Sequence, residues 1–159
     1  MAETVLVTGG TGFVAGWCIV ELLQRGYTVR TTVRSLSKEA AVRAAAAIAL
    51  GQIGDEAAVV PLVEILSGSS SKKKSKARDD EFLMRAAAQS LGEIRSHAGV
   101  TGLIATLNNE TNAIDVRRAA AQALGLIGDT SAMPALKAAI ASNDPYLAQT
   151  AKEALRRMH

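Results

Sequence analysis

Short apolar runs and glycines alternate over the first 38 residues in the order of a strand, a loop, a helix and a second strand. Residues 4–8 carry three consecutive apolar residues, which predict a strand buried on both faces. Apolar side chains then recur at helical spacing over 13–25, and Gly26 is suited to end that helix. Residues 27–33 are rich in β-branched side chains and predict the second strand. The pattern therefore predicts a parallel β-α-β unit.

Residues 39–159 repeat one helical pattern in Ala-rich stretches that align without gaps and contain Leu-Gly-x-Ile. These stretches are 42–55, 84–94 and 116–129. Their glycines, Gly51, Gly92 and Gly125, lie 41 and 33 residues apart. Each glycine is expected to end its helix, and the following Ile to fill the core. Asp55 and Asp129 suit the N-cap or first turn of the next helix.

A second helix follows each of these stretches, with apolar residues at matching positions. The matched sets are Val59, Val100 and Met133; Leu62, Leu103 and Leu136; and Leu66, Leu107 and Ile140. Pro61 and Pro134 fall in first turns, where a missing N–H costs little. A final helix over 144–157 has no partner helix and would cap the stack. The fold class predicted is mostly α with a small parallel β element, ending in an α-solenoid of about three repeats plus a capping helix.

Composition divides the chain at the same place. Residues 1–38 hold 2 Ala and 13 Val, Ile or Thr, whereas residues 39–159 hold 28 Ala. Because β-branched residues favour strands and Ala favours helix, we predict two units, 1–38 and 39–159. Aromatic residues make up only 3% of the chain, which fits helices that approach closely through Ala-rich faces.

Charge adds one local feature, a basic insertion at 67–78 with five cations. These are Lys72, Lys73, Lys74, Lys76 and Arg78. We interpret the insertion as a flexible solvated loop, with contact to nucleic acid or another anionic surface as the alternative. It has no aromatic side chain on which a base could stack, and the net charge is only +3, so a nucleic-acid partner is not expected.

Few residues offer metal or thiol chemistry. The single cysteine, Cys18, excludes an internal disulfide and is expected to be a reduced thiol packed on a helix. His97 and His159 have no metal-ligand spacing to other donors and are interpreted as surface residues. The start lacks the basic region of a signal peptide, and no apolar run reaches the roughly 20 residues that span a bilayer. We therefore expect a cytoplasmic protein without membrane contact.

The N-terminal unit resembles the extended short-chain dehydrogenase/reductases, through Val5 to Val14 and Arg25 to Arg34. It is most similar to their NADP-dependent, dihydroflavonol-reductase-like branch. The resemblance implies a Rossmann-like unit that binds NADP. The residues it assigns to the cofactor are Gly9, Gly12, Phe13 and Val14 in the glycine loop, and Arg34 and Lys38 near the 2′-phosphate. The alternative is that the glycine loop only makes the strand-to-helix turn.

The resemblance covers about a quarter of the chain, and the catalytic part of the family is missing. That family uses a Tyr-x-x-x-Lys pair, in which Lys lowers the pKa of the Tyr. Here Tyr146 and Lys152 are six residues apart rather than four. We therefore predict that the chain is not an enzyme, requires no cofactor, and would bind NADP only weakly.

The repeats resemble HEAT repeats of the phycobilisome-lyase-like type, whose members bind proteins or tetrapyrroles or act as scaffolds. This resemblance covers roughly 120 residues. A reductase unit joined to a solenoid indicates a chimera, and we favour a constructed one over a natural gene fusion. Because a two-stranded ribbon has free edges, we predict a homo-oligomer through the βαβ edges. Three hypotheses follow for the function: a non-enzymatic fusion scaffold, a weak NADP-binding module, and a HEAT adaptor for a protein or chromophore.

Overall fold

The computed structural model describes residues 3–8, 18–19, 21–22, 25, 27–31, 39–67 and 77–158. Two strands and seven α-helices have both of their ends within these residues. The strands are β1 (Thr4–Val7) and β2 (Thr28–Thr31). The helices are α2 (Glu39–Ile53), α3 (Val59–Leu66), α4 (Ala77–Ile94), α5 (Val100–Asn108), α6 (Ile114–Ile127), α7 (Met133–Ile140) and α8 (Pro145–Arg157). Among the residues described, no helix has the length and apolar character needed to cross a membrane.

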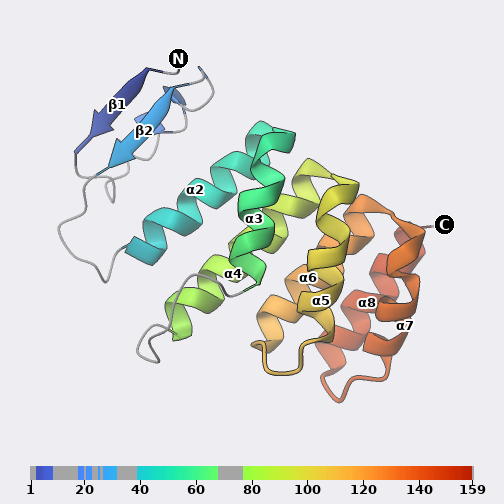
Figure 1. Ribbon diagram of the computed structural model, residues 1–159. Coiled ribbons are helices and arrows are strands. Elements are labelled where there is room, and N and C mark those ends of the chain that lie inside the picture. Colours follow the sequence, from blue (N-terminus) through green and yellow to red (C-terminus); the bar gives the residue numbers. More distant parts are fainter. Residues whose placement is uncertain are drawn as a thin grey trace.

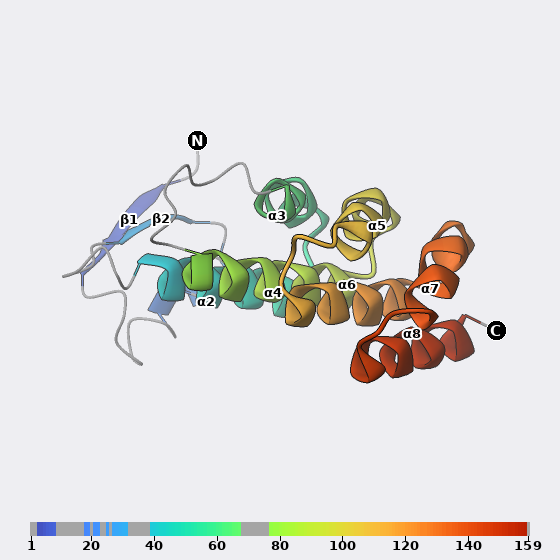
Figure 2. The same ribbon diagram turned by 90° about the horizontal axis from the view of Figure 1, so that it is seen from below.

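The helices form two layers, which Figures 1 and 2 show from two sides. We call α2, α4, α6 and α8 the A helices, and α3, α5 and α7 the B helices. Each A helix packs along the next, whereas successive B helices touch only sparsely. The core between the layers is built from the leucines predicted by the repeat pattern, including Leu62, Leu103 and Leu136, all almost fully buried. The predicted solenoid of three repeats and a capping helix is confirmed.

The repeated glycines have a different role from the one predicted. Gly51, Gly92 and Gly125 lie inside α2, α4 and α6, so the prediction that they end these helices is wrong. A Cβ atom on Gly92 would lie 2.8 Å from the Cα of Ala123, and one on Gly125 would lie 2.6 Å from the Cα of Ala154. Gly51 meets Ser90 in the same way. The glycines therefore let the backbones of neighbouring A helices touch.

Each of these helices ends two residues after its glycine, and the next residue lies in the left-handed region. Gly54 and Gly128 have φ of 74° and 77°, and their N–H groups donate back to the carbonyls of Leu50 and Leu124. In the second repeat this position is Arg95, with φ of 57°. The left-handed backbone is favourable for glycine and costs energy for arginine.

The predicted caps are confirmed. Asp55 and Asp129 each accept a hydrogen bond from the backbone N–H two residues later, at 2.9 and 2.8 Å. They begin short 3-10 turns that lead into α3 and α7. Asp144 accepts from the N–H of Leu147 at 2.6 Å and begins α8. Pro134 lies in the first turn of α7, as expected.

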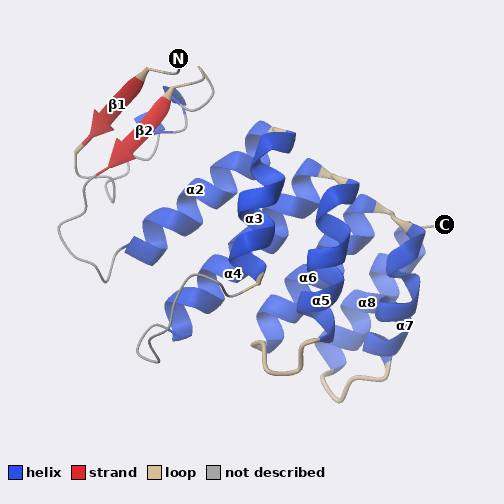
Figure 3. Ribbon diagram, in the orientation of Figure 1, coloured by secondary structure: helices blue, strands red, loops and turns tan. Residues whose placement is uncertain are grey.

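The two strands pair in parallel, with Thr4 beside Thr28 and Val7 beside Thr31 (Figure 3). This is the pairing that a β-α-β unit requires. The expected burial on both faces is wrong, because Leu6 is 62% exposed and exposed residues alternate with half-buried ones. The sheet has two strands in the part of the chain described, fewer than a full parallel sheet that is covered on both faces.

The basic insertion is shorter than predicted at its C-terminal end. Helix α4 begins at Ala77, so residues 77 and 78 belong to it, and the acidic residues that follow lie near its N-terminus. Residues 68–76 lie outside the described part of the chain.

Candidate functional site

The six residues predicted to bind a cofactor fall outside the described ranges. They are Gly9, Gly12, Phe13, Val14, Arg34 and Lys38. In this unit the structure describes the parallel strands β1 and β2, which come before and after the glycine loop in the sequence. It also describes Ile19, which lies between the strands in the sequence and is buried. The prediction for these residues stays a prediction.

Two hollows open among the B helices, one on each side of the C-terminal half of α5. We call the first the α3–α5 groove; it has a volume of about 240 Å³. Its lining comes from α3, from α5 and from the loop after α5. The lining residues are Val63, Leu66, Ser67, Gly102, Ala105, Thr106, Asn109 and Asn112. The groove exists because α3 and α5 pack only sparsely against each other.

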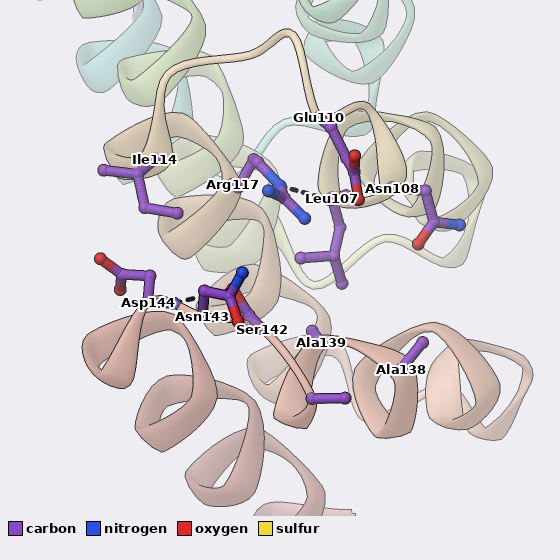
Figure 4. A pocket seen from close by; sticks show the side chains of 11 residues that line it. Leu107, Asn108, Glu110, Ile114, Arg117, Ala138, Ala139, Ser142, Asn143 and Asp144 are labelled. Carbon is purple, nitrogen blue, oxygen red and sulfur yellow. Dashed lines mark hydrogen bonds between the residues drawn. The ribbon is translucent and has the colours of Figure 1, made fainter.

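We call the second the loop hollow; it has a volume of about 640 Å³ and lies between the α5–α6 and α7–α8 loops (Figure 4). Its apolar lining includes Leu107, Ile114, Ala138, Ala139 and Ala141. Its polar lining is Asn108, Glu110, Arg117, Ser142, Asn143 and Asp144. The small alanines of α7 and the loop after it leave this space open.

Arg117 is fixed within the loop hollow by the end of α5. Its Nε donates a hydrogen bond of 2.9 Å to the carbonyl of Leu107, which the helix leaves without an internal partner (Figure 4). Glu110 and Asp144 line the same hollow, but no ion pair joins either to Arg117 in the part of the chain described. The hollow thus contains both a donor group and acceptor groups that are not paired with each other.

Apart from Glu110, Arg117 and Asp144 in the loop hollow, the surface around the two hollows carries few charges. Of the exposed side chains on the described B helices, only Glu64 and Lys137 are charged. The loop between the hollows satisfies its own polar groups, since the Asn112 amide donates to the carbonyl of Thr106 at 3.0 Å. A weakly charged surface with amide donors and acceptors suits contact with polypeptide backbone more than with a strongly charged ligand.

The remaining candidate residues of the described part are possible metal ligands, the cysteine and a histidine. They contain no cluster of His, Cys, Asp or Glu suited to a metal ion. Cys18 is exposed, so the expectation that its thiol packs on a helix is wrong. His97 lies at the surface as predicted, but its Nδ1 is 2.6 Å from Asp129 of the next repeat. That hydrogen bond, with two more from Ser131, lowers the pKa of Asp129 from 3.8 to about 2.

The loop hollow was not foreseen from the sequence. The repeat alignment places Arg117 opposite Arg43 and Met84, so the pattern alone gives it no special status. The alanines at the end of α7 and at the start of the α7–α8 loop leave the guanidinium facing open space. The sequence contained a signal of this, because Ala138 corresponds to Glu64 of α3 and Ala141 corresponds to Asn108 of α5.

Comparison with known proteins supports both parts of the sequence analysis. A family model described as HEAT repeats matches residues 75–156, and one described as PBS lyase HEAT-like repeat matches residues 42–68. The N-terminal segment is similar to plant proteins. It is 68% identical over 34 residues to Protein BRI1-5 ENHANCED 1 of Arabidopsis thaliana, covering 21% of this chain and 9% of that protein.

Two reductases give the same result. The chain is 66% identical over 32 residues to a dihydroflavonol 4-reductase of Dianthus caryophyllus, covering 20% of this chain and 9% of that enzyme. It is 45% identical over 42 residues to a bifunctional dihydroflavonol 4-reductase/flavanone 4-reductase of Pyrus communis, covering 26% and 12%. The chain thus spans only about a tenth of the length of these relatives, and its remaining residues follow the helical repeat models.

Proposed function

The chain belongs to the HEAT-repeat family, and we propose that it is a non-enzymatic scaffold whose B helices hold an extended segment of a partner protein. One observation carries this proposal: the α3–α5 groove and the loop hollow lie on either side of α5, so one segment could pass across α5 and occupy both. HEAT-type repeats commonly mediate protein interactions through such extended surfaces.

The chemistry of the two hollows supports a polypeptide as the ligand. Small residues such as Gly102 and Ala138 allow a chain to approach the helices closely. Arg117 offers donors to carbonyl groups, and the carboxylate of Glu110 can accept from N–H groups. An extended segment carries both kinds of group on its backbone, so it can use both sides of this lining.

Peptide selection against the wild-type chain tests the proposal. Peptides selected from a random library should lose binding when Ala105→Arg fills the groove or Ala138→Arg fills the hollow. Both alanines are exposed, so the variants should fold. Ala57→Arg, at an exposed alanine in a turn away from both hollows, is the matched control and should bind normally. Peptides that bind all four proteins equally would contradict the proposal.

A second function belongs to the N-terminal unit: weak binding of NADP. Its support is the similarity to reductases over this segment and the parallel register of β1 and β2, which a dinucleotide-binding β-α-β unit needs. Titration with NADPH and NADH measures it. Binding of NADPH that Arg34→Ala weakens selectively is the expected result, and no binding at millimolar NADPH would exclude it.

The strand edges support self-association as a further part of the proposal. Neither β1 nor β2 has a second strand neighbour among the described residues, and Leu6 is largely exposed. Pairing with the strands of a second copy would satisfy the free N–H and C=O groups. We expect a dimer in light scattering, and Leu6→Lys should shift it toward monomer. A wild-type chain that is monomeric at all concentrations would exclude this.

A further inference from the structure

Neighbouring A helices meet at one repeated position. The glycines of α2, α4 and α6 face a residue of the next A helix, which is Ser90, Ala123 or Ala154. All three of these residues are almost fully buried. Ser90 and Ala123 each lie two residues before the glycine of their own helix, and Ala49 lies at the same place in α2. This position therefore marks the side of an A helix that faces the preceding repeat.

Ala49 is buried although α2 is the first A helix of the solenoid. Its exposed fraction is 3%, whereas Ala45, one turn earlier in α2, is exposed. Helix α4 packs along one side of α2, and Figure 1 shows the later repeats on that side and the two strands on the other. We therefore expect the residues that cover Ala49 to belong to the N-terminal unit.

The N-terminal unit offers a buried aliphatic side chain for this contact. Ile19 is 9% exposed and lies in a helical stretch between the two strands, which we call the Ile19 helix. Half-buried Leu22 lies three residues later and so on the same face, whereas Glu21 and Arg25 form an exposed ion pair at 2.6 Å. Neither Ile19 nor Ala49 belongs to the main core between the A and B layers, so both are buried by other contacts.

We propose that the Ile19 helix packs on the outer face of α2, with Ile19 beside Ala49, and so caps the solenoid at its N-terminal end. A small residue at this position lets a helix approach closely, as Ala123 and Ala154 do within the solenoid. Solenoids need terminal units that cover the face left by a missing neighbour. A second copy of the chain is not required, because Ala49 is buried within a single chain. The reductase-like unit would thus serve the HEAT repeats by packing, independently of NADP.

Hydrogen exchange of the full chain tests this proposal. Ile19→Asp places a charge in the apolar contact, so exchange of the backbone amides of residues 47–53 should become about tenfold faster. Exchange in α8, at the other end of the solenoid, should not change. Cys18→Asp is the matched control, because Cys18 is the exposed neighbour of Ile19 in the same helical stretch, and it should leave α2 unchanged.

A nitroxide label on Cys18 measures the proximity directly, since this exposed thiol belongs to the single cysteine of the chain. In nuclear magnetic resonance spectra, the label should broaden the amide signals of α2 around Ala49 and leave those of α8 sharp. Ala49→Arg should remove this broadening without a loss of helical circular dichroism. Ala45→Arg, at an exposed alanine of the same helix, should keep it.

Three results would overturn the proposal. In the first, exchange in α2 is the same in Ile19→Asp and in wild type. In the second, both aspartate variants speed exchange in α2 equally, which would show that the contact does not depend on Ile19. In the third, the label on Cys18 broadens no signal of α2. Faster exchange confined to the Ile19 variant, together with broadening that Ala49→Arg removes, supports it.

Discussion

Single glycines set the distance between the A helices. Gly125→Ala would place a Cβ 2.6 Å from the Cα of Ala154, a backbone atom that cannot move without separating α6 and α8. We expect a loss of about 1–3 kcal/mol in the free energy of unfolding, although Ala favours helix by about 1 kcal/mol. Urea unfolding measures this.

The control for that prediction is Gly102→Ala on the B helix α5. Its Cβ would meet a methyl group of Val63 at 3.0 Å, and that side chain can rotate away. The cost should be smaller than at Gly125, or replaced by a gain. Equal losses at both positions would show that backbone contact is not what the A-layer glycine provides.

Arg95 occupies a position that the other repeats give to glycine. Its φ of 57° is unfavourable for a side chain with a Cβ atom. Arg95→Gly should therefore raise the free energy of unfolding by about 0.5–1 kcal/mol, whereas Arg95→Ala keeps the strain and should not. A destabilised glycine variant would contradict this account, and thermal melts of the three proteins decide it.

Asp129 links stability to pH. The hydrogen bond from His97 lowers its pKa in the folded state to about 2, below the ordinary value of 3.8. The carboxylate therefore contributes stability that is fully present above its unfolded pKa and is lost as pH falls from about 4 to about 2. The stability advantage of wild type over Asp129→Asn should be present at about pH 5 and disappear in strong acid.

Nuclear magnetic resonance titration of the Asp129 side chain gives a direct check. His97→Ala should raise its pKa toward the ordinary value, because the first cause of the shift is then gone. Thr130→Ala, at an exposed residue of the same turn, should leave the titration unchanged. An unchanged pKa in the His97 variant would exclude the histidine as the cause.

At the scale of elements, the caps decide where the last helix begins. Asp144→Ala removes the side-chain acceptor for the N–H of Leu147, and about 1 kcal/mol of stability should be lost. Hydrogen exchange in the first turn of α8 should become faster. Asp115→Ala is the control, because Asp115 lies in the first turn of α6 without capping it, and it should cost less. Equal effects would contradict a capping role for Asp144.

The elements that sequence analysis predicted well are those fixed by neighbours in the chain. Asp55 and Asp129 cap helices because each accepts a hydrogen bond from an N–H two residues later. The role of Gly92 was missed because the residue it contacts, Ala123, lies in the next repeat. A glycine after leucine resembles a helix end by local rules, and only packing shows that the helix continues.

The candidate sites show the same division between local and distant causes. Leucines at repeat spacing predicted the core, but the loop hollow depends on where Arg117 and the α7–α8 loop meet in space. The low aromatic content fitted close helix packing, yet it did not show that Phe82 and Tyr146 would remain outside the core. Exposure of a large side chain is a result of the fold and is not visible in a single repeat.

At the scale of the whole molecule, the main buried cluster of the described residues belongs to the solenoid. It runs from Ala44 to Ala154 and includes no described residue of the strands. A chain of residues 39–159 should keep its helical circular dichroism and unfold cooperatively, whereas residues 1–38 alone should not form a stable sheet. A solenoid that loses cooperative unfolding without the first 38 residues would show that the N-terminal unit stabilises it.

One position of α8 departs from the repeat pattern. The position of Gly51, Gly92 and Gly125 is taken in α8 by Arg156, which is exposed. Its long side chain occupies the surface at which the glycines of the other A helices allow backbone contact.

The unequal spacing of the two layers has a mechanical consequence. The A helices are in contact through glycine, so the A layer of the solenoid resists both stretching and compression. The B helices have room between them, so bending of the solenoid would change the width of the α3–α5 groove and the loop hollow together. A ligand bound in one hollow would thereby set the width of the other. A pulling force on the chain would change how tightly that ligand is bound.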